Sequence, residues 1–199
     1  MKDKLNISEI FYSIQGEGAR VGTANIFIRT QGCKAKNACY AMGIKCDTEF
    51  ESGKEYSINS LYNEIKDIDC KNIIWTGGEP AQQLTDDIVK YFKDKGYYQT
   101  IETSGLFSVP ESIDFISVSP KVAEHVIKKN FTKISELRYV RHKGQDIPKP
   151  SVKADYYFVS PHSDGFTLNF ENIKHCLELV KNNPTWRISI QMHKIYSVL

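Results

Sequence analysis

Long apolar runs and blocks of like charge are both missing from the sequence. No segment approaches the roughly 20 apolar residues of a membrane-spanning helix, and residues 1–15 lack the apolar stretch of a signal peptide. The 26 Lys and Arg residues are nearly balanced by 24 Asp and Glu residues, so the net charge is only +2. These absences argue against a membrane protein and a nucleic-acid-binding protein, and we expect a cytoplasmic protein.

Cysteine is scarce and unevenly placed. Of the five cysteines, Cys33, Cys39 and Cys46 lie within fourteen residues, whereas Cys70 and Cys176 stand apart. Disulfides do not persist in a reducing compartment, so the clustered thiols indicate metal binding or catalysis. The two isolated cysteines are predicted to be small core residues. For the second of them, the helical spacing predicts one apolar face made of Ile173, Cys176, Leu177 and Val180.

The composition, 41% hydrophobic and 25% charged, is typical of one globular domain, which we expect to span residues 1–199. Helical patterns occupy residues 57–68, 85–96 and 169–183, with Ser57 and Thr85 as N-caps and Gly96 as a stop. Runs rich in β-branched and aromatic residues predict strands at 26–31, 73–76, 99–103, 115–118, 137–140, 156–159 and 187–191. This alternation predicts an α/β fold with parallel strands, an incomplete TIM-type barrel of about six βα units.

Polar motifs directly follow five of the predicted strands. They are the loop that begins at Cys33, "TGGEP" (76–80), "TSG" (103–105), "SPK" (119–121) and "SPHSDG" (160–165). Because the carboxyl ends of parallel strands meet at one edge of a barrel, these motifs are expected to line one site.

The spacing of the three clustered cysteines bears on the metal. A structural zinc site normally needs four protein ligands, with cysteines paired as in C-x2-C, and no such pair is present. A [4Fe-4S] cluster normally takes one thiolate per iron, so three thiolates leave one iron open and favour catalysis. A non-catalytic zinc- or iron-binding module is the alternative.

The cysteine triad followed by "GGEP" resembles the radical S-adenosylmethionine superfamily. Further motifs resemble one family within it, the 7-carboxy-7-deazaguanine synthases: "FYSIQGEG" (11–18), "IRTQGC" (28–33), "CDTEF" (46–50), "ETSG" (102–105), "SPK" (119–121) and "QMHKIYSVL" (191–199). The resemblance implies that 6-carboxy-5,6,7,8-tetrahydropterin is converted to 7-carboxy-7-deazaguanine, with loss of ammonia, through a 5′-deoxyadenosyl radical. It also implies a flavodoxin or ferredoxin as electron donor and a homodimer.

The same resemblance implies the site residues, without assigning a catalytic side chain. The substrate residues are Ile14, Gln15, Gly16, Glu17, Arg29, Thr76 and the terminal Leu199. The residues implied for S-adenosylmethionine are Gly78, Glu79, Ser119, Lys121, Ser160, Pro161 and His162. The implied metal ligands are Cys33, Cys39 and Cys46 for the cluster and Thr48 for Mg²⁺.

One motif departs from the family pattern. Superfamily members usually carry C-x3-C-x2-C, whereas this chain reads C-x5-C-x6-C, with Gly43 three residues before Cys46. A chain that has lost its cluster is therefore one alternative, and a glycyl-radical activating enzyme that acts on a protein partner is another.

We predict that Cys39, despite the unusual spacing, is a cluster ligand. Replacing it in Cys39→Ala removes one of three thiolates, so iron and sulfide content after anaerobic reconstitution should fall as far as in Cys33→Ala. Cys70→Ala and Cys176→Ala are the matched controls and should retain the cluster. A Cys39→Ala protein with a full cluster and normal S-adenosylmethionine cleavage would refute the assignment.

Overall fold

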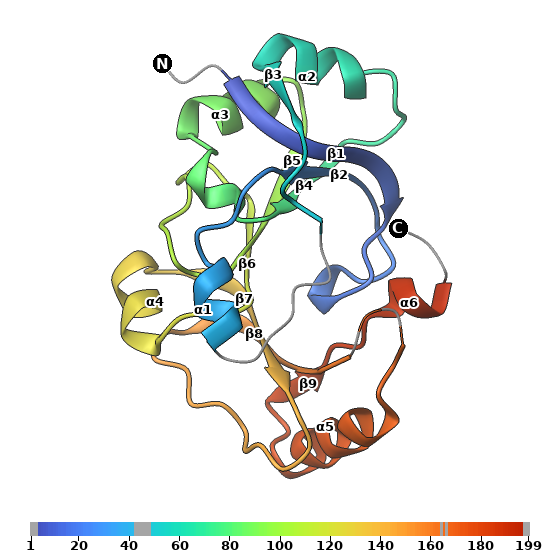
Figure 1. The fold of residues 1–199 in the computed structure, drawn as a ribbon, viewed down its shortest axis with the longest axis vertical. Coiled ribbons are helices and arrows are strands. Elements are labelled where there is room, and N and C mark those ends of the chain that lie inside the picture. Colours follow the sequence, from blue (N-terminus) through green and yellow to red (C-terminus); the bar gives the residue numbers. More distant parts are fainter. Residues whose placement is uncertain (1–3, 42–48, 164, 166, 197–199) are drawn as a thin grey trace.

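The structure is a computed structural model and describes residues 4–41, 49–163, 165 and 167–196 (Figure 1). Cys46, Thr48 and Leu199 therefore lie outside the described residues. The strands are β1 (Lys4–Ile14), β2 (Ala24–Thr30), β3 (Lys54–Ser57), β4 (Asn72–Gly77), β5 (Tyr98–Thr103), β6 (Phe115–Val118), β7 (Ile134–Arg141), β8 (Ala154–Pro161) and β9 (Trp186–Ile188). The helices are α1 (Lys36–Ala41), α2 (Ile58–Ile65), α3 (Asp86–Asp94), α4 (Glu124–Asn130), α5 (Phe170–Asn182) and α6 (Met192–Tyr196), with short 3-10 turns η1 (Gly18–Arg20) and η2 (Pro80–Gln82).

The strands described here form one sheet in the order β3-β1-β2-β4-β5-β6-β7-β8-β9. All neighbours from β2 to β9 pair in parallel, so the predicted α/β fold with parallel strands is confirmed. The edge strands β3 and β9 stand at opposite ends of this order, so the curved sheet is open and not a closed barrel. The antiparallel strands β1 and β3 were not predicted, and β9 ends at Ile188, three residues earlier than expected.

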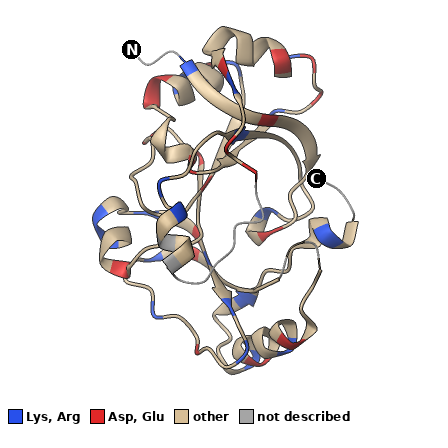
Figure 2. Ribbon diagram, viewed as in Figure 1, with Lys and Arg blue, Asp and Glu red and all other residues tan. Residues whose placement is uncertain are grey.

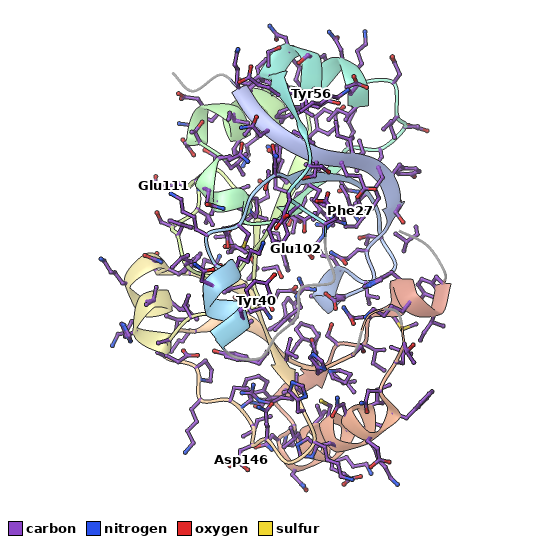
Figure 3. All side chains as sticks on the ribbon, viewed as in Figure 1. Phe27, Tyr40, Tyr56, Glu102, Glu111 and Asp146 are labelled. Atoms are coloured by element: carbon purple, nitrogen blue, oxygen red, sulfur yellow. The ribbon has the colours of Figure 1, made fainter. Side chains whose placement is uncertain are left out.

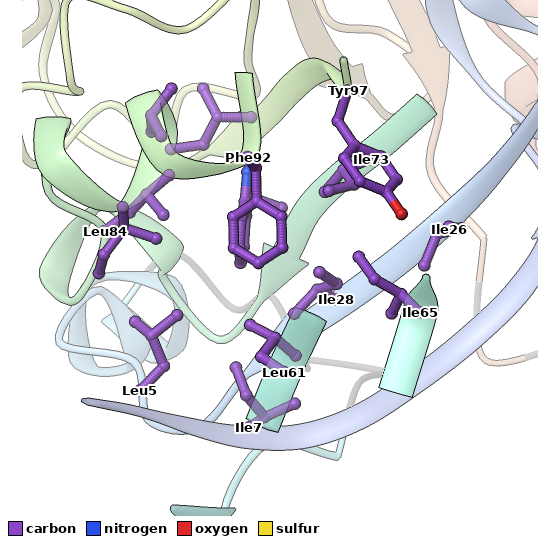
Figure 4. Close-up of a cluster of buried hydrophobic side chains, with 14 of the residues drawn as sticks. Leu5, Ile7, Ile26, Ile28, Leu61, Ile65, Ile73, Leu84, Phe92 and Tyr97 are labelled. Atoms are coloured by element: carbon purple, nitrogen blue, oxygen red, sulfur yellow. The ribbon is translucent and has the colours of Figure 1, made fainter. Parts of the chain in front are cut away.

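The two faces of the sheet differ in character because side chains alternate along each strand. On one face, Ile28 of β2 and Trp75 of β4 belong to a core cluster with residues of α2 and α3, part of which is shown in Figure 4. A second cluster joins Val118 of β6 to residues of α4 and α5. The intervening residues of the same strands, among them Arg29 and Thr76, line a cavity. Packing on one face therefore fixes the positions of the polar side chains on the other.

The helix ends follow the sequence signals. The Ser57 hydroxyl accepts a hydrogen bond from the Ser60 amide at 3.1 Å, and Thr85 accepts one from Ile88 at 3.4 Å. Both N-caps are thus confirmed. Gly96 ends the α3 segment with a φ of +82°, a conformation that glycine adopts without steric cost.

The isolated cysteines are buried as predicted, Cys70 beside β4 and Cys176 in α5. The predicted apolar face of α5 is wrong at Leu177, which is 43% exposed. Leu177 directly follows Cys176 and is rotated from it by about 100° around the helix axis, away from the sheet. The buried side instead includes Asn172, whose amide group donates to the His162 carbonyl at 2.8 Å and accepts from the Lys143 amide at 2.8 Å.

Figure 2 shows Lys and Arg interspersed with Asp and Glu along the ribbon, in agreement with the small net charge. In the part of the chain that the structure describes, no helix has the length and apolar character needed to cross a membrane.

Candidate active site

The loop that carries Cys33 is bonded to the end of the neighbouring strand. The Gly78 amide donates to the Thr30 carbonyl at 3.0 Å, and the Glu79 amide donates to the Gly32 carbonyl at 2.9 Å. A Cβ atom on Gly78 would lie 2.0 Å from the Gly32 carbonyl oxygen and 3.2 Å from Cβ of Cys33. Glycine is therefore required at position 78 by the approach of the chain to its own cysteine loop.

Two of the three expected cluster ligands can be placed. Cys33 follows β2, and Cys39 lies in α1, where its amide donates to the Ala35 carbonyl at 3.0 Å. Both residues are partly exposed. No three His, Cys, Asp or Glu side chains within the described ranges converge on a metal position. The expected third thiol, Cys46, and the expected Mg²⁺ ligand, Thr48, fall outside those ranges. Partly exposed thiols beside a glycine-lined strand end are suitable donors for an iron–sulfur cluster.

Glu79 is fully buried and connects two strand ends. Its carboxylate accepts hydrogen bonds from the Thr103 hydroxyl at 2.7 Å and from the Ser104 amide at 2.9 Å, and it also accepts from the Ser104 hydroxyl. The loop after β6 joins the same edge, because the Ser119 amide donates to Thr103 at 2.8 Å and the Lys121 amide donates to Ser104 at 3.1 Å. The expected S-adenosylmethionine residues of these three loops are thus adjacent.

The remaining residues expected to bind S-adenosylmethionine lie at the end of β8. Ser160 and Pro161 are the last residues of the strand and are buried, although the sequence placed them in a loop. His162 follows the strand, where its amide donates to the Arg141 carbonyl at 3.0 Å. Its ring stacks on that of His142 with centroids 4.1 Å apart.

A cavity of about 560 Å³ lies on the inner face of the sheet. It is lined by six of the seven residues expected to bind substrate: Ile14, Gln15, Gly16, Glu17, Arg29 and Thr76. The seventh, Leu199, is outside the described residues. Figure 3 labels Phe27 and Glu102, two further lining residues from β2 and β5, in the middle of the molecule. Residues distant in sequence therefore meet around one space.

Glu102 is the centre of hydrogen bonding on the inner wall of this cavity. It accepts from the Gln15 side-chain amide at 3.0 Å, from the Thr76 hydroxyl at 3.0 Å and from Nη2 of Arg138 at 2.9 Å. Burial acts to raise the pKa of Glu102, but the Arg138 charge and these hydrogen bonds outweigh it, and the pKa is lowered. Glu102 therefore faces the cavity as a carboxylate.

Arg138 is bonded to further carboxylates from other elements. Its Nη1 lies 2.6 Å from Glu17, and its Nε lies 3.2 Å from Glu136 in a geometry that makes an ion pair but not a hydrogen bond. Glu136 in turn accepts from the Ala19 amide and the Ser117 hydroxyl, each at 2.7 Å. Burial acts to lower the pKa of Arg138, and the surrounding carboxylates raise it. The guanidinium thus stays charged at every working pH.

The neighbouring part of the cavity lining, on β1 and β2, combines aromatic rings with a cation. Phe11 and Phe27 stack with their centroids 4.9 Å apart. The Arg29 guanidinium lies 5.6 Å from the Phe11 ring centre, and its Nε donates to Glu9 at 3.1 Å. This wall can accept a flat ring together with an anionic group.

The C-terminal segment closes one side of the cavity. The Met192 amide donates to the Gly16 carbonyl at 3.0 Å, and a Cβ atom on Gly16 would lie only 2.4 Å from Nδ1 of His193. His193 and Lys194 of α6 line the cavity together with Gln191. Helix α6 is thus brought next to the turn that carries the expected substrate residues.

Comparison with known proteins identifies the family. The chain is 34% identical over 193 residues to the 7-carboxy-7-deazaguanine synthase of Bacteroides thetaiotaomicron, across 96% of this chain and 97% of that protein. It is 32% identical to the Haemophilus influenzae protein of the same name, across 97% of this chain and 93% of that protein. The chain belongs to the 7-carboxy-7-deazaguanine synthase family. No known family model matches it.

The fold agrees with this family assignment. The crystal structure of QueE from Escherichia coli superposes with a TM-score of 0.69 across 94% of each chain, at 20% identity. That likeness shows the fold alone. The predicted membership of the 7-carboxy-7-deazaguanine synthase family is confirmed.

Several residues of the site in this family member were not predicted: the lining residues Glu102, His193 and Lys194, and Arg138, which lies behind Glu102. Two signals were available. Charged residues inside otherwise apolar strands indicate buried polar contacts, and Glu136 and Arg138, two apart, share one face of β7.

We predict that Gly78→Ala displaces the cysteine loop, because the added methyl would overlap the Gly32 carbonyl. Overpacking of this kind typically costs about 1–3 kcal/mol in the free energy of unfolding, measurable by denaturant titration. Iron content after reconstitution should fall as well, since the loop that carries Cys33 must move.

Gly144→Ala is the control for a destabilising Gly→Ala change elsewhere in the chain. Gly144 has a φ of +87° but open space around it, so this variant tests backbone strain without steric overlap. It should lose some stability and keep its iron. Equal iron loss in both variants would contradict the proposed role of Gly78.

Proposed function

We propose that this chain converts 6-carboxy-5,6,7,8-tetrahydropterin to 7-carboxy-7-deazaguanine with loss of ammonia, a step of queuosine and deazapurine biosynthesis. The observation that carries the proposal is the gathering of six expected substrate residues around one cavity, on the sheet that bears Cys33 at its edge. Family membership supports it, because the relatives are 7-carboxy-7-deazaguanine synthases.

The cofactor residues lie along the carboxyl edge of the sheet. Cys33 and Cys39, with Cys46, would hold a [4Fe-4S] cluster, and Thr48 would ligate Mg²⁺ beside the substrate. When bound, the cluster and S-adenosylmethionine would supply, with one electron from the donor, the radical chemistry needed to abstract a hydrogen atom from the pterin. Gly78 and Glu79, with Ser119, Lys121, Ser160, Pro161 and His162, would surround S-adenosylmethionine. Glu79 contributes chiefly by keeping the ends of β4 and β5 together.

The cavity residues bind and orient the pterin. The Arg29 guanidinium is suited to hold the substrate carboxylate, in exchange for or alongside its contact with Glu9. Glu17 and Glu102 accept hydrogen bonds from ring N–H and amino groups, while Gln15 and Thr76 fix the Glu102 carboxylate. The stacked Phe11 and Phe27 rings exclude water from the face of the pterin.

The same proposal covers the fold type, the location, the oligomeric state and the electron donor of the protein. The open parallel sheet corresponds to an incomplete TIM-type barrel of about six βα units that forms one domain over residues 1–199. The protein works in the cytoplasm as a homodimer and receives electrons from a flavodoxin or ferredoxin. A small-molecule substrate suits the cavity of about 560 Å³, which lies within the roughly 300–1,000 Å³ range of small-molecule sites.

The alternatives are less well supported. A glycyl-radical activating enzyme needs to admit a peptide, whereas this cavity presents paired carboxylates and an arginine suited to a small heterocyclic acid. A non-catalytic metal-binding module does not require a cavity lined by such charged side chains.

Anaerobic turnover tests the proposed function. Protein reconstituted with iron and sulfide, a chemical reductant, S-adenosylmethionine, Mg²⁺ and the tetrahydropterin should yield 7-carboxy-7-deazaguanine and ammonia, detected by mass spectrometry. A fully reconstituted protein that leaves the pterin unchanged would refute the function.

We predict that a short tag added after Leu199 raises the substrate KM substantially and leaves the iron content unchanged. In the family the terminal carboxylate reaches the substrate, and α6 lies against Gly16 beside the cavity. An extension would move the negative charge of the terminal carboxylate away from the pterin. The same tag on the N-terminus is the control, and equal KM values for the two proteins would reject a role for Leu199.

A further inference from the structure

We infer that Arg138 is a positioning residue that keeps Glu102 ionised and aligns it with Glu17 as a pair of acceptors for the N–H groups of the substrate. This inference rests on the proposed function and deepens it, since it assigns the selectivity of the cavity to a residue behind its wall. Arg138 itself is buried, with 6% of its side chain exposed, and acts through the two glutamates.

The two terminal nitrogens of the Arg138 guanidinium bind two different glutamates. Nη1 binds Glu17, which comes from the turn after β1, at 2.6 Å, and Nη2 binds Glu102, which comes from β5, at 2.9 Å. Both glutamates line the cavity, with 22% and 21% of their side chains exposed. The planar, rigid fork of donors therefore sets both the separation and the orientation of the two carboxylates.

Arg138 is needed to offset the negative charge of the carboxylates around it. Glu17, Glu102 and Glu136 bring three negative charges to one buried region, and Arg138 is the cation that contacts all three. Like charges disfavour ionisation of one another, so without the guanidinium the Glu102 carboxyl would bind a proton more readily. A protonated carboxyl donates a hydrogen bond, and a donor facing the N–H groups of a pterin would repel them.

Other charged groups face the same space and enter any pH dependence. Glu9 and Arg29 come from β1 and β2, Glu49 from the segment before β3, and His193 and Lys194 from α6. Each of these elements packs around the cavity, but among the residues that the structure describes it is Arg138 that forms ion pairs with both Glu17 and Glu102. The pKa of Glu102 is lowered with Arg138 as the nearest charge.

The pair of carboxylates should select a heterocycle whose groups facing them are all hydrogen-bond donors. A 2-amino-4-oxo pyrimidine ring offers an amino group and a ring N–H side by side, which suits two ionised carboxylates. A pteridine with oxygen in place of the 2-amino group would place an acceptor against a carboxylate and should bind at least tenfold more weakly.

The test uses equilibrium binding of the tetrahydropterin to reconstituted protein between pH 3 and pH 8, together with turnover. In the parent protein, affinity should fall only toward the acid end of this range, because the pKa of Glu102 is lowered and the carboxylate gains a proton there. Arg138→Lys keeps a charge but loses the fork, so the pH at which affinity falls (the acid limb) should move up by about one pH unit, with about tenfold weaker binding on the slope of the limb.

Glu136→Gln is the second variant; its one amide oxygen can still accept from the Ala19 amide, and its NH2 group can donate to the Ser117 hydroxyl, which then accepts instead of donating. It removes one competing negative charge, so its acid limb should move to lower pH. Arg141→Met is the matched control: Arg141 lies on the other face of β7, donates to the main-chain carbonyls of Asp146 and Val140, and should leave the limb in place. Thermal melts verify that each variant is folded.

A merely structural role would weaken binding equally at every pH and leave the limb fixed, and that result would overturn the inference. If Arg138→Lys does not fold, the Glu136→Gln variant decides: an acid limb at the same pH as in the parent protein would also overturn the inference. The proposed function is judged separately: binding without turnover in the parent overturns the function alone, whereas no binding of the pterin at any pH overturns both.

Discussion

The buried guanidinium of Arg138 joins parts of the chain that are far apart in sequence. It lies in β7 and contacts Glu17, which is 121 residues earlier, and Glu102 of β5. Moving such charges out of water is costly, and the cost is offset only where partners and hydrogen bonds surround them. Removal of one partner from a buried ion pair typically costs about 3–5 kcal/mol, because the remaining charge is left uncompensated. The turn after β1 therefore has one low-energy position, and the cavity takes its shape from it.

The site has two regions that depend on different physics. At the carboxyl edge of the sheet, glycine backbone lies so close to the cysteine loop that no side chain fits between them. On the inner face, ionised and hydrogen-bonding side chains occupy alternate positions of strands whose other positions are core. Steric exclusion positions the strand end beside the expected cofactor residues, and electrostatic pairing positions the expected substrate residues. Both regions rest on the same parallel strands.

Much of the fold could be predicted because the parallel strands are short apolar runs separated by helical patterns. Strand β1 was missed because an irregularity in its pairing between Ile7 and Glu9 interrupts the alternation of apolar and polar residues. Strand β3, with Tyr56 as its one apolar residue, forms through pairing with β1 and carries little signal of its own. Its position depends on tertiary contacts.

The site shows a similar division. The expected substrate residues came from local motifs and were found around one cavity, since a motif fixes residue types close in sequence. The contacts of Glu102 and Arg138 depend on strand order and on a turn far away in the chain, which no local pattern specifies.

The backbone hydrogen bonds of Gly78 and Glu79 to the cysteine loop also affect how much the spacing between the cysteines can vary. A loop fixed at its base loses conformational entropy only logarithmically with length, so a doubled length adds roughly 0.6 kcal/mol. Insertions beyond Cys33 therefore cost little free energy, and a longer spacing between the thiols is compatible with a stable loop.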